Sequence, residues 1–174
     1  DFEQRINEME FYFPIKTIRP PTLQKLFEHH GRDQDGKNYP AQMEKLIFNP
    51  VSGFLKGYID LVFQYQDRFF LVDWKSNYLV PTIDNYRRDV LGDVMSANFY
   101  TLQYHLYALA LCQYLRLKNT AFRYENNFGG AAYLFIRGID HRRSPEYGIY
   151  FDRPKATLIN ALGKSLIPDF EKFI

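Results

Sequence analysis

Residues 53–76 read GFLKGYIDLVFQYQDRFFLVDWKS, two apolar, aromatic-rich runs separated by a short polar segment. Each run carries one aspartate, Asp60 in GYIDLVF and Asp73 in FFLVDWK, and Lys75 follows Asp73 by two positions. A strand with one buried face tolerates a carboxylate poorly unless something offsets its desolvation. The two carboxylates and the lysine therefore suggest a divalent-metal site built on a hairpin.

The hairpin itself follows from the two runs, because residues 54–63 and 69–76 are rich in β-branched, aromatic and leucine side chains. Centring the turn on Gln66–Asp67 places Asp60 directly opposite Asp73, with Cβ atoms about 4.5–5.5 Å apart. Gln-Asp is not a strong two-residue turn sequence, and a slip of one residue would separate the two carboxylates.

Two facing carboxylates repel each other, and a bound cation removes the conflict. Oxygen ligands favour Mg²⁺, Mn²⁺ or Ca²⁺ over zinc. Lys75 shares a strand face with Asp73, and its ammonium could hold a scissile phosphate, stabilise developing negative charge or orient an attacking water. This combination suits phosphodiester hydrolysis. The alternative is that all three are ordinary surface charges on a half-exposed hairpin.

Four segments, in this order, resemble a known family of nucleases. GFLKGYIDLVF and FFLVDWKSNYL resemble its metal-binding hairpin, YTLQYHLYALALCQYLR resembles its helix with a Q-x-x-x-Y motif, and FGGAAYLFIRGID resembles the strand that follows. The family is that of the RecB-type C-terminal nuclease domains, within the PD-(D/E)xK nuclease superfamily. The resemblance runs from about Glu8 to Asp140. It implies an α/β, restriction-endonuclease-like fold, a mixed β-sheet flanked by helices.

The resemblance also implies the roles of the hairpin residues. Asp60 and Asp73 would bind the metal, and the main-chain carbonyl of Trp74 would be a further ligand. Lys75 would be the catalytic lysine. The implied cofactor is Mg²⁺, with Mn²⁺ or Ca²⁺ able to substitute in binding.

Residues outside the hairpin complete the implied site. Glu10, in NEMEFYFPI, resembles the upstream acidic residue that helps to organise metal and water, although Glu8 would lie on the same strand face. Gln103 and Tyr107 are spaced i, i+4 and would share one helix face. In the family this face looks toward the active site and the DNA. From the residues alone, the pair would equally fit the polar edge of a core helix.

The function implied is that of a magnesium-dependent exodeoxyribonuclease of the exodeoxyribonuclease V (RecBCD) type. Such an enzyme processes double-strand breaks for homologous recombination in the cytoplasm. The implied partners are DNA, as single strands and duplex ends, the subunits RecC and RecD, and RecA. The sequence contains no phosphate-binding P-loop, so the ATP-binding helicase motor would lie elsewhere in the parent protein.

One family feature is missing. RecB-type nucleases also use a histidine metal ligand on a helix upstream of the acidic residue, but no histidine precedes His29, and the chain begins with Asp1. We therefore expect residues 1–174 to be a single nuclease domain, cut from a larger protein and lacking its N-terminal part. The isolated fragment would then be weakly active or inactive.

Two other functions stay open. The chain could be an interaction module that docks RecA or a partner subunit; intact Asp60, Asp73 and Lys75 argue against lost catalysis but not against docking. It could also be a CRISPR-adaptation or AddAB-type nuclease, but those commonly carry four cysteines for an iron–sulfur cluster. Cys112 is the single cysteine of this sequence, and its helical context predicts a core residue.

Composition agrees with one folded domain. The chain is 46% hydrophobic and 18% aromatic, which argues against disorder, and its formal net charge of +2 permits nucleic-acid contact without demonstrating it. We find no apolar run of about 18 residues and no signal peptide, and so predict no membrane span.

The remaining pattern is read coarsely. Residues 86–89 are predicted to be either an exposed helix or a mobile loop. The other elements predicted are a strand over 8–18, a helix over 22–30, a loop over 31–40, a less regular stretch over 77–97, a helix over 98–117, strands over 131–137 and 147–151, and a final helix from Pro154 that Pro168 could break.

Overall fold

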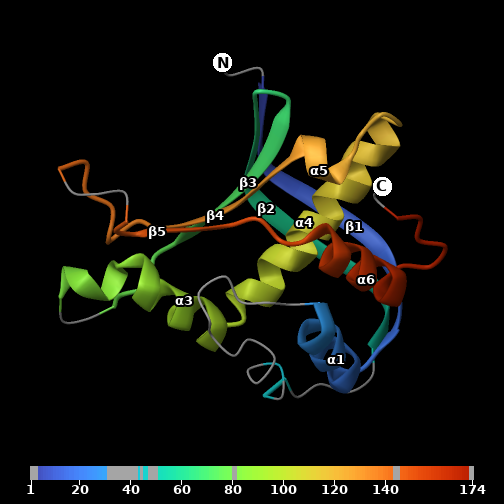
Figure 1. The fold of residues 1–174 in the computed structure, drawn as a ribbon, viewed down its shortest axis with the longest axis horizontal. Helices are drawn as coiled ribbons and strands as arrows, with labels where there is room; N and C mark the ends of the chain where they lie inside the picture. Colours follow the sequence, from blue (N-terminus) through green and yellow to red (C-terminus); the bar gives the residue numbers. More distant parts are fainter. Residues whose placement is uncertain are drawn as a thin grey trace.

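The predicted hairpin lies in the middle of a five-stranded sheet with the order β1-β2-β3-β4-β5 (Figure 1). The computed structural model describes residues 4–30, 43, 45–46, 51–79, 82–142 and 146–172. All neighbouring strands pair antiparallel except β3 and β4, which are parallel, so the sheet is mixed as predicted. The strands are β1 (Arg5–Ile18), β2 (Val51–Tyr65), β3 (Arg68–Lys75), β4 (Phe128–Phe135) and β5 (Ile149–Asp152).

The hairpin has the predicted register. Strands β2 and β3 pair from Tyr65↔Arg68 to Leu61↔Val72, and the turn is Gln66–Asp67. Both turn residues have positive φ, 48° and 61°, which suits a two-residue turn matched to the twist of the strands. The recorded ladder ends at Leu61↔Val72, so Asp60 and Asp73 come immediately after the last pair.

The parallel pairing of β3 with β4 brings the C-terminal half of the chain to the hairpin. Asp73 lies opposite Tyr133, and Lys75 lies opposite Phe135. A parallel pair needs a long crossover, and here the helices between β3 and β4 supply it. Residues 60 positions apart in the sequence therefore share one place on the sheet.

The helices pack against the sheet and against one another. Helix α6 contacts α1, α4 and β1, and α3 contacts α4 and β5, as Figure 1 shows. Residues of α4 are buried on several sides. The helices are α1 (Pro20–His30), α3 (Arg88–Ala97), α4 (Tyr100–Lys118), α5 (Tyr124–Asn127) and α6 (Ala156–Leu166), with a 3-10 turn, η2 (Ile83–Tyr86), before α3.

Several element boundaries differ from those predicted. Helix α1 begins at Pro20 rather than Thr22, because proline is tolerated in the first turn, where its missing N–H has no partner to lose. Strand β1 begins at Arg5, β4 begins at Phe128, and the short helix α5 was not predicted. Helix α6 ends at Leu166, before Pro168. The loop predicted over 31–40 lies outside the described residues.

The stretch predicted as exposed helix or mobile loop is partly neither. Tyr86 ends the 3-10 turn and is buried, and its hydroxyl accepts from Leu79 N–H at 3.0 Å and donates to the carbonyl of Asn77 at 2.9 Å. The Tyr86 hydroxyl thus bonds two main-chain groups, and these bonds hold the segment that follows β3. Helix α3 then begins at Arg88.

Candidate active site

Asp73 is the most deeply buried carboxylate at the hairpin, with 3% of its surface exposed. Its Oδ2 lies 2.5 Å from Lys75 Nζ, and the two groups form an ion pair. Burial raises the pKa of Asp73, the ammonium of Lys75 opposes that increase, and the charge of Asp60 adds to it. A carboxylate whose pKa is raised by burial and which pairs with a lysine is a candidate for a functional site.

Asp60 is held where the ladder between β2 and β3 stops. Its Oδ2 accepts the main-chain N–H of Trp74 at 2.8 Å, so the carboxylate takes the place that a strand carbonyl would occupy. This contact fixes the carboxylate next to β3, one residue along from Asp73. Strand register and this hydrogen bond therefore bring the two predicted metal ligands together. The side chain of Trp74 itself is 49% exposed and points away from the core.

Lys75 is enclosed by polar and aromatic groups, and only 12% of its side chain is exposed. Besides Asp73, its Nζ donates to Gln103 Oε1 at 3.1 Å. It also lies 4.1 Å from the ring centroid of Tyr100 and 5.0 Å from that of Tyr133, a distance at which a cation is attracted to the ring face.

Gln103 of α4 makes three side-chain hydrogen bonds in the site. Its Oε1 accepts from Lys75 and from the hydroxyl of Tyr133 at 2.9 Å, and its Nε2 donates to the hydroxyl of Tyr107 at 2.9 Å. Burial raises the pKa of Tyr107 to about 12, and the charge of Asp73 adds to the increase. Tyr107 is therefore a neutral phenol at pH 7. Gln103 and Tyr107, the two helix residues predicted to face the site, therefore lie next to Lys75 in the structure.

The packing under Tyr107 depends on a glycine. Gly57 faces Phe11 across β1 and β2, and a Cβ at position 57 would meet the Phe11 ring. The Phe11 ring lies edge-on to Tyr107 with centroids 5.7 Å apart. Any larger residue at position 57 would move Phe11 against Tyr107. The GYID motif therefore holds an active-site support as well as a metal ligand.

The upstream acidic residue was predicted to be Glu10, with Glu8 on the same strand face, and this assignment stays a prediction. Glu10 forms an exposed ion pair with Lys56 at 2.7 Å, and no described contact joins it to the hairpin carboxylates. Glu8 instead lies between the pairs Asn7↔Leu61 and Met9↔Ile59, so the register sets it opposite Asp60. Its φ of 50° interrupts the regular strand, a local irregularity that sequence reading could not detect. An open cleft of about 600 Å³ is lined by Arg5, Asn7, Glu8, Asp60, Leu61 and Trp74.

Comparison with known proteins agrees with this geometry. The model of the PD-(D/E)XK nuclease superfamily matches residues 15–164. The chain belongs to this superfamily. Asp73-Trp74-Lys75 fits the (D/E)XK part of its name, and Asp60 is the earlier aspartate, with Ile59 where the name has proline.

Relatives of this PD-(D/E)XK domain include RecBCD enzyme subunit RecB of several bacteria. The protein of Escherichia coli is 43% identical over 152 residues, 87% of this chain and 12% of the relative. That of Buchnera aphidicola subsp. Schizaphis graminum is 37% identical over 165 residues, 94% of this chain and 13% of the relative. That of Haemophilus influenzae is 36% identical over 157 residues, 90% and 12% respectively. The chain thus spans about an eighth of the length of these relatives.

The donor set of the PD-(D/E)XK site fits a hard divalent cation. Mg²⁺ is commonly held by one or two carboxylates, with water and substrate phosphate completing its shell. The Asp60–Asp73 pair supplies that number. In the described parts of the chain, no group of three or more His, Cys, Asp and Glu side chains comes together to hold a metal. A contribution from the carbonyl of Trp74 stays a prediction.

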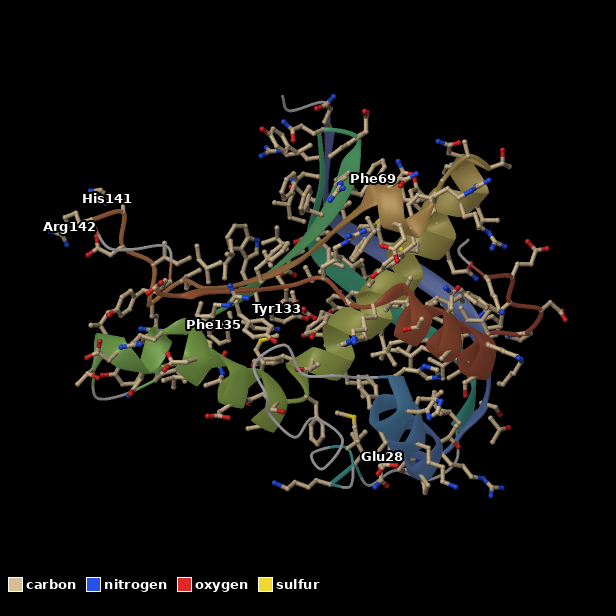
Figure 2. The ribbon with its side chains drawn as sticks, viewed as in Figure 1. Glu28, Phe69, Tyr133, Phe135, His141 and Arg142 are labelled. Atoms are coloured by element: carbon tan, nitrogen blue, oxygen red, sulfur yellow. The ribbon has the colours of Figure 1, made fainter. Side chains whose placement is uncertain are left out.

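Two aromatic residues of the site were missed by sequence reasoning. Tyr133 and Tyr100 flank Lys75, and Figure 2 shows Tyr133 beside Phe135 on β4. The place of Tyr133 depends on the parallel pairing of β3 with β4, which sets it opposite Asp73, whereas Tyr100 is the first residue of α4. No local sequence pattern predicts the parallel pairing of two distant strands. A tyrosine in the otherwise apolar FGGAAYLF was the available signal, since a buried hydroxyl needs a partner. Among the residues that the structure describes, no helix is long and apolar enough to cross a membrane.

Proposed function

We propose that this domain hydrolyses phosphodiester bonds in DNA with the help of Mg²⁺. The observation that carries the proposal is the buried Asp73 carboxylate, which lies next to a second carboxylate, Asp60, and forms an ion pair with Lys75. Two neighbouring carboxylates beside one lysine carry negative charge that a divalent cation would compensate. Membership of the PD-(D/E)XK superfamily supports the same chemistry.

The residues divide the work by position and charge. Asp60 and Asp73 would hold the ion, which when bound would act as a Lewis acid toward the scissile phosphate. Lys75, the one cation of the described hairpin that contacts Asp73, would stabilise charge that develops on the phosphoryl oxygens or orient the attacking water. We assign the upstream acid to Glu8, because Glu8 and not Glu10 shares a cleft with Asp60.

We infer a wider setting from the relatives, which are RecB subunits of RecBCD enzymes. The domain would act in an exodeoxyribonuclease V type helicase–nuclease that processes double-strand breaks, on single strands and duplex ends. RecC and RecD would be its partner subunits, and RecA would receive its product. In this setting the reaction would take place in the cytoplasm.

The direct test is cleavage of labelled single-stranded DNA by the intact protein. Cleavage should require Mg²⁺, and Asp73→Ala should reduce it by about 1000-fold. Asp152→Asn is the matched control, since this carboxylate also lies on a strand and accepts from a tyrosine, Tyr104, at 2.7 Å. Full cleavage by the Asp73 variant, or equal loss in both variants, would overturn the site assignment.

A docking role is the second candidate, and an exposed aromatic pair on β1 and β2 favours it. Tyr12 is 60% exposed and Phe54 is 59% exposed, and their rings stack 4.5 Å apart at an angle of 5°. Large exposed aromatic surfaces are enriched at protein interfaces. The partner would be RecA or a sister subunit. Replacing both rings by serine should weaken that association and leave cleavage of naked DNA unchanged; unchanged association would dismiss the candidate.

A further inference from the structure

A buried tyrosine on β4 bonds to the active-site glutamine. Tyr133 is fully buried, at 0% exposure, and its ring contacts those of Tyr100 and Tyr104 at centroid distances of 6.0 Å. Its hydroxyl donates to Gln103 Oε1 at 2.9 Å. A phenylalanine would satisfy the packing at this position, so the hydroxyl needs a further explanation.

The hydroxyl supports the orientation of the Gln103 amide that Lys75 requires. A glutamine amide has one oxygen that accepts and one nitrogen that donates, and the two ends are otherwise almost the same shape. Lys75 can only donate, so Oε1 must face it at 3.1 Å. Tyr133 donates to the same oxygen, and Nε2 is then directed to the hydroxyl of Tyr107. With the amide turned around, Nε2 would face the ammonium, and the two would repel.

Lys75 in turn depends on this arrangement. Its stem has four methylene groups, and a free lysine samples many rotamers. Here Nζ lies among Asp73 Oδ2, Gln103 Oε1 and the rings of Tyr100 and Tyr133. When a cation occupies the Asp60–Asp73 site, it competes with Lys75 for Asp73. Gln103 and the two rings are then the remaining contacts that keep the ammonium in place.

We propose that Tyr133 is a positioning residue, which acts through Gln103 to hold the Lys75 ammonium at the reacting phosphate. The inference deepens the nuclease proposal and rests on it. Tyr133 does not touch substrate, since it is buried behind Gln103 and Lys75. Its hydroxyl holds the Gln103 amide in its orientation. The amide and the Tyr133 ring face hold the Lys75 ammonium in position, and the ammonium acts on the phosphate.

The test compares two tyrosines that differ in what their hydroxyls bond. Tyr133→Phe removes the bond to Gln103, while Tyr124→Phe removes a bond of 2.7 Å from an equally buried tyrosine to the carbonyl of Pro154. In the intact protein, Tyr133→Phe should lower kcat for single-stranded DNA about five- to tenfold and leave KM within twofold. Tyr124→Phe should leave both unchanged. Equal kcat in the two variants, or a fall in both, would refute the positioning role.

Two further measurements separate positioning from stability. In a Gln103→Leu background, Tyr133→Phe should change kcat by less than twofold, because its effect passes through the amide. An undiminished five- to tenfold loss there would contradict that path. In crystals of the metal-free Tyr133→Phe protein, Lys75 Nζ should have left Gln103 Oε1; an unchanged Lys75 would count against the proposal. Absence of cleavage by the wild-type protein would instead defeat the nuclease proposal, and the crystal structure would still decide whether Tyr133 holds Lys75.

Discussion

Helix α4 carries two polar pairs with the same spacing, and they serve different purposes. Gln103 and Tyr107 face the hairpin, whereas Thr101 and His105 are buried within the helical core. Both pairs are spaced i, i+4, so each lies on a single face of the helix. The sequence alone does not tell which pair belongs to a site.

The core pair is joined by one hydrogen bond within its own helix. His105 Nδ1 donates to the carbonyl of Thr101 at 2.7 Å, a local bond that fixes the tautomer. The ring of Phe27 lies 5.1 Å away edge-on, and that of Tyr104 stacks at 4.4 Å. Burial lowers the pKa of His105 to about 4, so the imidazole is neutral at pH 7. Thr101 Oγ1 is buried without a hydrogen-bond partner, but a neutral hydroxyl tolerates this better than a carboxylate does.

The site pair belongs to a network that crosses three elements and carries charge. Gln103 joins Lys75 of β3, Tyr133 of β4 and Tyr107 of α4. Its charged members are Lys75 and Asp73, and Asp60 adds a second carboxylate next to Asp73. A neutral pair within one helix stabilises the fold. A charged network that joins several elements can bind a ligand. This difference distinguishes structure from function on one helix.

Of the changes to the candidate site, loss of Lys75 should have the largest effect on DNA cleavage. Lys75→Met should reduce DNA cleavage about 100- to 1000-fold, since it removes the group that faces developing charge. Lys16→Met is the control, because Lys16 also lies on a strand but donates to the carbonyl of Lys164. Steady-state cleavage rates at saturating Mg²⁺ measure both. Equal rates for the two variants would place Lys75 among the structural residues.

Removal of the amide should have the next largest effect. Gln103→Ala should lower kcat about 10- to 100-fold and lower the unfolding free energy far less than that loss of activity would suggest. Gln113→Ala, at another half-buried glutamine of α4, provides the comparison. Kinetics and urea denaturation are measured on the same preparations. If activity falls only in proportion to the folded fraction, Gln103 is the polar edge of a core helix.

The core pair should respond to pH instead. The pKa of His105 is lowered to about 4 in the folded protein. Between pH 6.5 and pH 4, His105 is therefore protonated in the unfolded chain but neutral in the folded chain. This stabilisation is complete above pH 6.5 and is lost as the pH falls toward 4. Its loss should amount to about 2 kcal/mol by pH 4.5. His105→Gln should flatten that part of the curve of unfolding free energy against pH; an unchanged curve would mean that His105 titrates normally.

The smallest effect should be a gain in stability. Asp73→Asn in metal-free protein should leave the unfolding free energy unchanged or raise it by up to about 1 kcal/mol, because a carboxylate whose pKa is raised by burial is destabilising at pH 7. Excess Mg²⁺ should stabilise the wild type and not the variant. A loss of several kcal/mol without metal would make Asp73 a structural residue like those around His105.

Sequence reasoning predicted the hairpin and its register, because the short polar segment between the two apolar runs sets the turn at Gln66–Asp67. The family resemblance, rather than residue spacing, predicted the face of α4 that meets Lys75. Sequence reasoning failed where distant segments decide the contacts, as at Tyr133, which reaches Lys75 only through a parallel strand pair. It also preferred Glu10, because a positive φ at Glu8 cannot be read from residue order.

The central claim is that Asp60 and Asp73 hold a divalent cation. Anomalous diffraction from crystals of the intact protein soaked in Mn²⁺ tests it most directly. One strong peak should appear within coordination distance of both carboxylates, with Lys75 released from Asp73 and still bonded to Gln103. A map with no peak there, and with the Lys75–Asp73 contact intact, would contradict it.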